Sequence, residues 1–385
     1  MQVLSSLEPL AVVAVLSTSL LPGTPTRRAD ATIEAVPRAH SEFAALAFDM
    51  FAGSDVWAGN GLGIWRTDDN GKHWDDITPA NLVGDDPAVR LTGFGWSGRQ
   101  HLWFSASEAG DVTKQGLRGF AIERSGDGGR TWYWTALPSC AGCSISFSFL
   151  SPTQGFALGS NGNLYSTLNG GASWSLVPTL LPRSDVPAVD FVSGELGWSS
   201  SGRLLERTTD GGRAWERVVV PGPAPVALSA PHFFSATSGV VAGSLPSGKG
   251  AVYATSDGGG QWQVEPLPAA PNPPSSSPGW FSAPAFEVSS PVTWAVTSDR
   301  KLYVTGNAGR RWARVPTPTL YGKGDPIWGF AMATTTSGWL AAAATPCGAS
   351  PRDLCAVPVL LGTTDQGRTW RVVPSSSPAT PGAFS

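Results

Sequence analysis

The sequence predicts an all-β protein, a seven-bladed β-propeller of four-stranded antiparallel blades with one copy of a short motif in each blade. The motif, Ser/Thr-x-Asp/Asn-x-Gly-x-x-Trp, recurs seven times between residues 67 and 370, and successive copies start 41 to 58 residues apart. A supersecondary unit that repeats at this period is typical of propellers and solenoids. The composition agrees, because 46 Gly, 33 Pro and 17 Trp suit short strands, glycine turns and large apolar side chains between sheets.

Residues 188–221 show the repeating unit most clearly. The runs "AVDFV", "LGWSSSG", "RLLERTT" and "AWERVVV" alternate in polarity and are separated by Gly, Ser and Asp, which predicts four antiparallel strands. No stretch combines a sustained 3.6-residue period with a cap, so we expect almost no helix. The same interpretation assigns the other blades to 42–78, 88–137, 144–180, 225–268, 280–316 and 326–374.

The motif falls in the turn between the third and fourth strands of each blade. There the Asp or Asn oxygen can accept backbone N–H groups, the Gly can take a positive φ, and the Trp can wedge against the neighbouring sheet. Because two copies carry Asn, a shared catalytic carboxylate is excluded. The predicted structural residues are Asp69, Asp127, Asn169, Asp210, Asp257, Asn307 and Asp365, with Trp74, Trp132, Trp174, Trp215, Trp262, Trp312 and Trp370.

The N-terminal segment, residues 1–31, is signal-peptide-like. Its apolar run, residues 9–23, is too short to span a bilayer comfortably, and "ADA" at 29–31 resembles a cleavage site. We therefore expect an exported protein, secreted, periplasmic or associated with the cell envelope, with no integral membrane span after processing. The alternative is a disordered N-terminal tail. The propeller is expected over residues 32–376, followed by a disordered tail over 377–385.

Four cysteines form two close pairs in predicted loops, Cys140 with Cys143 and Cys347 with Cys355. In an exported protein two local disulfides are expected. The Cys-x-x-Cys pair could instead be a thiol redox pair, but it lacks the strand-to-helix context that lowers a thiol pKa. A four-Cys zinc site would require the two loops to meet in space.

The longer repeats "GFALGSNGNLYSTLNGGASW" (155–174) and "GWSSSGRLLERTTDGGRAW" (197–215) carry a family resemblance. The motif resembles the Asp-box, the repeat of bacterial neuraminidases, and the longer form resembles the photosystem II assembly and stability factors, which are seven-bladed propellers. The resemblance implies a propeller with a scaffold or assembly role. It is weaker for function than for fold, since one fold hosts many activities.

Insertions in the predicted loops concentrate on the face opposite the motifs, in adjacent blades. They bring charged and polar side chains to one sector: Asp85, Asp86, Arg90, Glu108, Asp111, Lys114, Arg118, Tyr321, Lys323, Asp325, Arg352 and Asp353. This sector is the candidate binding face for a protein partner or an envelope glycan. The alternative is that these residues are only solvated charges of long loops, which are commonly polar.

An enzymatic alternative is a glycoside hydrolase related to sialidases or xyloglucanases. It would need two carboxyl groups roughly 5–10 Å apart, such as Glu108 with Asp111 or Asp85 with Asp86. The Arg-x-Pro signature of sialidases is missing from the first blade, and no motif marks a catalytic residue. We therefore expect a non-enzymatic protein and assign no catalytic residue.

Cofactors and metals are not expected, since the four His form no ligand cluster. The net charge of −3 gives no basic footprint for nucleic acid. We expect a monomer.

Overall fold

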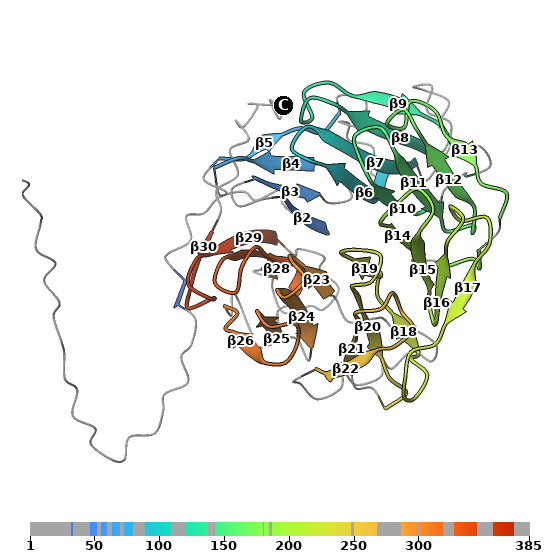
Figure 1. Ribbon diagram of the computed structural model, residues 1–385. Helices are drawn as coiled ribbons and strands as arrows, with labels where there is room; N and C mark the ends of the chain where they lie inside the picture. The colour runs from blue at the N-terminus through green and yellow to red at the C-terminus, as the bar shows by residue number, and fades with distance from the viewer. Residues whose placement is uncertain are drawn as a thin grey trace, which may run out of the picture.

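The protein is an all-β propeller in which sheets follow one another around a common centre in chain order (Figure 1). The computed structural model describes residues 32–33, 47–51, 55–59, 64–69, 73–79, 89–108, 120–137, 140, 143–179, 181–184, 187–247, 250–267, 286–298, 301–318, 327–344 and 357–372. Every regular element within these ranges is a strand. The predicted fold class and the antiparallel sheets are therefore confirmed.

The first three sheets each contain four strands. The first consists of β2 (Ala47–Phe51), β3 (Asp55–Gly59), β4 (Ile64–Thr67) and β5 (Asp75–Asp76). The second consists of β6 (Val89–Ser97), β7 (His101–Glu108), β8 (Phe120–Ser125) and β9 (Tyr133–Thr135). The third consists of β10 (Ile145–Phe149), β11 (Gly155–Gly159), β12 (Leu164–Thr167) and β13 (Ser175–Leu176).

The remaining sheets follow the same order. The fourth consists of β14 (Pro187–Phe191), β15 (Gly197–Ser201), β16 (Leu204–Thr208) and β17 (Glu216–Val218). The fifth consists of β18 (Ala227–Leu228), β19 (His232–Phe233), β20 (Gly239–Ser244), β21 (Gly250–Thr255) and β22 (Gln263–Pro266). The sixth consists of β23 (Phe286–Val288), β24 (Trp294–Ser298), β25 (Lys301–Thr305) and β26 (Trp312–Val315). The seventh consists of β27 (Ile327–Met332), β28 (Gly338–Ala344), β29 (Val357–Thr363), β30 (Thr369–Val372) and β1 (Thr32–Ile33).

Two of the seven sheets formed by the described strands depart from the expected four strands. In the fifth, the first strand is divided into β18 and β19, and Pro231 lies just before β19, where a residue without an N–H interrupts the ladder. In the seventh, β1 pairs in parallel with β30, with Thr32 opposite Thr369 and Ile33 opposite Trp370. That the ring contains seven blades in all stays a prediction.

The propeller has two distinct faces. The Asp-box turns bond to the turns between first and second strands, as when the Gly170 amide donates to the Thr153 carbonyl (2.8 Å) and the Gly211 amide to the Glu195 carbonyl (2.9 Å). We call this side the box face. Because neighbouring strands are antiparallel, the hairpins between second and third strands lie at the opposite ends, on what we call the hairpin face.

The core lies between the sheets. Aromatic side chains from adjacent sheets stack in pairs: the Trp103 ring lies 3.4 Å from that of Phe149, and the Trp198 ring 3.4 Å from that of Phe233. In each pair the Trp comes from a second strand and the Phe from the first strand of the next sheet. These contacts join neighbouring sheets, so burial in this fold holds the blades against one another.

Candidate functional site

In the Asp-box turns, the side-chain oxygens of the acidic residue accept hydrogen bonds from groups of the same turn. In the second sheet, Asp127 Oδ1 accepts the amide N–H groups of Arg130 (3.0 Å) and Thr131 (2.9 Å), and the Ser125 hydroxyl (2.8 Å). The Thr131 hydroxyl donates to Oδ2 (2.6 Å), and the Gly129 amide donates to the Ser125 hydroxyl (2.8 Å). Burial alone would raise the pKa of Asp127, but the bonds from Thr131, Ser125 and Arg130 outweigh it and lower the pKa to about 2.

The copies that carry Asn make the same contacts as those that carry Asp. Asn169 Oδ1 accepts the Ser173 amide (2.9 Å), and Asn307 Oδ1 accepts the Arg311 amide (2.8 Å). Donation from backbone amides also lowers the pKa of the acid in three other boxes, at Asp210, Asp257 and Asp365. The shared requirement of the position is thus an acceptor oxygen, which a neutral amide supplies as well as a carboxylate does.

Each described Asp-box turn from the second sheet onward contains two consecutive residues in the left-handed region. Both are glycine in four boxes, as at Gly211 (φ 75°) and Gly212 (φ 85°). Ala308 (φ 57°) and Gln366 (φ 63°) occupy the first of these positions in the sixth and seventh sheets. The sequence motif requires glycine at the second position only, so the expectation of a single left-handed residue was incomplete.

The Asp-box tryptophans reach the preceding sheet. The Trp132 indole N–H donates to the Ile77 carbonyl beyond β5, and that of Trp370 donates to the Pro316 carbonyl beyond β26, both at 2.8 Å. Trp370 is fully buried. The apolar clusters between sheets also contain Trp174, Trp215, Trp262 and Trp312.

Towards the hairpin face, the ladders that the described second and third strands form differ in length. Counted from the strand residue that begins each Asp-box, β3 and β4 pair at four positions, from Val56 opposite Thr67 to Gly59 opposite Ile64. The ladder of β7 and β8 continues for six positions, and that of β28 and β29 for seven. At about 3.4 Å per residue, these two ladders extend roughly 7 and 10 Å beyond that of the first sheet, which lies between them in the ring.

Two of the predicted binding-face residues, Arg90 and Glu108, lie at the hairpin-face ends of β6 and β7. Arg90 of β6 is opposite Ser107 of β7, and Val89 is opposite Glu108, so Arg90 and Glu108 are one residue out of register and do not form a cross-strand pair. A register shift between Leu91 and Gly93 follows Arg90 along β6. The other predicted residues lie outside the described ranges: Asp85, Asp86, Asp111, Lys114, Arg118, Tyr321, Lys323, Asp325, Arg352 and Asp353.

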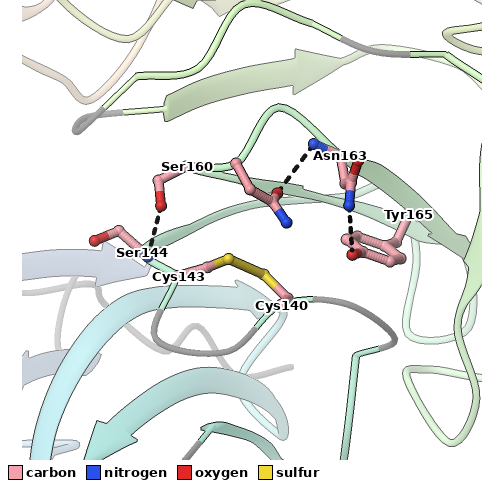
Figure 2. Close-up of a disulfide and its surroundings, with 7 residues drawn as sticks. Cys140, Cys143, Ser144, Ser160, Asn163 and Tyr165 are labelled. Carbon is pink, nitrogen blue, oxygen red and sulfur yellow. Dashed lines mark hydrogen bonds between the residues drawn. A yellow bond between two sulfur atoms is a disulfide. The ribbon is translucent and has the colours of Figure 1, made fainter. Parts of the chain in front are cut away.

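Cys140 and Cys143 are joined by a disulfide with a Cα–Cα distance of 5.5 Å (Figure 2). Both residues are buried in the cluster between the second and third sheets. The following residue ties this loop to the β11–β12 hairpin, because the Ser144 amide donates to the Ser160 hydroxyl (3.2 Å) and the Ser160 amide to the Ser144 carbonyl (2.9 Å). Cys347 and Cys355 lie outside the described residues.

Sequence reasoning missed a half-buried acid, Asp190 of β14. The Phe233 amide of the next sheet donates to its Oδ2 at 2.5 Å. Burial raises the pKa of Asp190 to about 7, although that hydrogen bond acts in the opposite direction. The available signal was an acid within the apolar run "AVDFV", which would have marked a polar residue facing a sheet interface.

Neither a metal centre nor a membrane span is visible in the portion that the structure describes. Its His, Cys, Asp and Glu residues include no group of three arranged to hold a metal ion. It also contains no helix with the length and apolar character needed to cross a bilayer.

Comparison with known proteins places the resemblance in the central sheets. The family model described as "Photosynthesis system II assembly factor YCF48" matches residues 121–270. The photosystem II assembly lipoprotein Ycf48 of Synechococcus sp. (strain CC9902) is 34% identical over 115 residues, which is 29% of this chain and 33% of that protein. The match thus spans about a third of the relative's length.

Solved structures support the fold. The GH74 xyloglucanase from Xanthomonas campestris has a TM-score of 0.61 at 15% identity, and the match covers 84% of this chain and 53% of that chain. YCF48 from Cyanidioschyzon merolae has a TM-score of 0.53 at 14% identity, covering 83% and 94% respectively. At these identities the structures show the propeller fold alone, while the family model and the Synechococcus relative show that this chain resembles the photosystem II assembly factors.

Proposed function

We propose that this chain is a non-enzymatic, exported propeller that binds a protein partner through its hairpin face and serves as an assembly scaffold. The observation that carries the proposal is the uneven hairpin face, where the ladders of the second and seventh sheets rise above the first sheet between them. The similarity to an assembly lipoprotein over the central sheets supports a protein as the partner.

The box face is a poor alternative for the partner site. Its repeated acids are occupied by their own turns, and their low pKa values keep them ionised at neutral pH, so they are not available as proton donors. We propose that these residues and their tryptophans are structural. A recognition surface requires features that differ from blade to blade, and these lie on the hairpin face.

The proposal includes several features of the whole chain. The propeller extends over residues 32–376 with seven blades, residues 1–31 direct export to the envelope, residues 377–385 form a tail, and the protein is a monomer. The seven sheets among the described residues support the blade count. The pairing of β1 with β30 supports a propeller that begins at residue 32.

Site-specific photocrosslinking tests the proposal. A photoreactive residue would replace Ser107, at the hairpin-face end of β7, and in a matched control Leu168, which is 78% exposed in the third Asp-box. Each variant would be irradiated in an envelope extract from the source organism. We expect a discrete protein adduct at position 107, lost on deletion of residues 108–118, and none at position 168. Adducts at 168 alone, or none at either position, would contradict the proposal.

The hydrolase alternative would use Glu108 and Asp111 or Asp85 and Asp86 of the same face. The xyloglucanase likeness supports it at the level of fold only. Screening against xyloglucan and other β-glucans tests it. Turnover that is abolished by Glu108→Gln or Asp111→Asn would establish a hydrolase in place of the scaffold.

A further inference from the structure

The joint between the fourth and fifth sheets has an acid at its centre. Asp190 of β14 accepts the Phe233 amide of β19 at 2.5 Å, and the Phe233 ring stacks on Trp198 of β15 at 3.4 Å with the ring planes 4° apart. This hydrogen bond and this stacked pair link β19 to β14 and β15. The same two sheets are also joined where the Leu228 amide donates to the Gly202 carbonyl (2.7 Å) and the Ser200 hydroxyl to the Ser229 carbonyl (2.9 Å).

The joint between the third and fourth sheets has the same construction with a neutral acceptor. There the Phe191 amide donates to the Ser148 hydroxyl at 2.8 Å, and the Phe191 ring stacks on Phe156 at 3.6 Å. In both joints the acceptor precedes the donor by 43 residues. The two joints are therefore structural equivalents in which Ser148 corresponds to Asp190.

Asp190 bonds to β19, a strand that forms few pairs within its own sheet. β19 contains two residues, which pair with β20 as His232 opposite Val240 and Phe233 opposite Gly239. By contrast, β14 pairs with β15 at five positions. Since its own sheet secures β19 so briefly, the bond across the joint carries a larger share of its attachment than the equivalent bond at Phe191.

Among the described residues of the elements packed against β14, no side chain places an opposite charge beside the acid at neutral pH. The elements packed against β14 are β10, β11, β15 and β19, and the only titratable side chain among their described residues is His232. Surrounding protein lowers the pKa of His232, so the imidazole is neutral near pH 7. Asp190 is half-buried, and ionising its carboxyl where protein replaces part of the surrounding water costs free energy that full exposure to water would recover.

We propose that the contact of Asp190 with Phe233 is a proton-sensitive joint: it is closed when Asp190 is protonated, and ionisation of Asp190 favours release of β19 from β14. The joint between the third and fourth sheets, held by Ser148, has no such dependence. The propeller would therefore loosen at one defined contact, that of β19 with β14, as the pH rises, while the bonds from Leu228 and Ser200 still join the two sheets.

The sign and range of the effect follow from the two protonation equilibria. The pKa of Asp190 is about 7 in the closed joint, and its ordinary value is 3.8. The opening equilibrium therefore grows as pH rises from about 4, and it becomes constant above about pH 7.5. Between pH 5 and pH 8 the expected increase is roughly tenfold to a hundredfold.

Amide hydrogen exchange, resolved by NMR and corrected for the intrinsic exchange rate, tests the proposal in the unmodified protein. The protection factor of the Phe233 amide should fall roughly tenfold to a hundredfold from pH 5 to pH 8. The Phe191 amide serves as the internal control and should keep its protection. Parallel behaviour of the two amides would overturn the proposal without need of any variant.

Exchanging the two acceptors tests the same idea in variants. Asp190→Ser should abolish the pH dependence at Phe233, and Ser148→Asp should create it at Phe191. If Asp190→Ser retains the full pH dependence, then another group controls the joint and the proposal is wrong. If Ser148→Asp does not fold, the pH dependence of the Phe233 and Phe191 amides in the wild-type protein still supports or overturns the proposal.

Discussion

Replacement of Trp370 by Ala is the sharpest test of the Asp-box as a structural clamp. The Trp370 side chain is fully buried in the cluster between the sixth and seventh sheets, where it packs with Leu302 and Val315 of the sixth. Its indole N–H donates to the Pro316 carbonyl at 2.8 Å. The substitution removes both the apolar contact and the hydrogen bond that join the two sheets.

The expected loss of stability is large. Burial of an aromatic side chain of about 200 Å² at about 25 cal/mol per Å² gives about 5 kcal/mol. Truncations of large buried aromatics to Ala commonly cost about 3–5 kcal/mol, and the lost hydrogen bond adds about 1 kcal/mol. We therefore expect Trp370→Ala to lower the free energy of unfolding by about 4 kcal/mol. Trp370→Phe keeps most of the ring and should cost about 1–2 kcal/mol.

Urea unfolding followed by circular dichroism measures the effect. Trp134→Ala is the matched control, because Trp134 lies on the outer strand of its sheet with 61% of its surface exposed. That variant should change the free energy of unfolding by less than about 1 kcal/mol. The reasoning is refuted if Trp370→Ala costs no more than Trp134→Ala.

Further predictions concern the turns and the disulfide. Gln366→Gly should raise the free energy of unfolding by about 0.5–1 kcal/mol in urea, because glycine adopts the observed φ of 63° without strain. Asp365→Asn should change it by less than about 1 kcal/mol, whereas Asp365→Ala should cost about 1–2 kcal/mol by leaving the turn amides without their acceptor. NMR titration should place the pKa of Asp127 near 2; the stability it contributes is complete above its ordinary pKa of 3.8 and is lost as pH falls towards 2. Alkylation of the native protein followed by mass spectrometry should leave Cys140 and Cys143 unmodified, and labelling without prior reduction would contradict the disulfide.

The sequence predicts most fully the turns and strands whose conformation depends on residues nearby in the chain. An Asx turn, a left-handed glycine and a following Trp lie within eight residues, so each copy of the motif marks its own turn. Alternating polarity then locates the adjoining strands. The motif does not predict the second left-handed residue, because Ala308 and Gln366 adopt that conformation without being glycine.

Features that depend on distant partners could not be predicted. The pairing of β1 with β30 joins Thr32 to Thr369, and two residues carry no periodic signal. Asp190 depends in the same way on an amide 43 residues away. At the candidate binding face the sequence indicated which loops share a side of the propeller, since antiparallel strands fix that. The pairing of Arg90 with Ser107, and of Glu108 with Val89, follows from strand register, which the sequence pattern left open.

The central claim is that the box face holds the propeller together and that the hairpin face binds a protein partner. Hydrogen–deuterium exchange of the protein with and without the partner identified by crosslinking tests it most directly. We expect added protection at the hairpin-face ends of β7, β8, β28 and β29, with the turns around Asp127, Asp210 and Asp365 unchanged. Protection confined to those turns would contradict it.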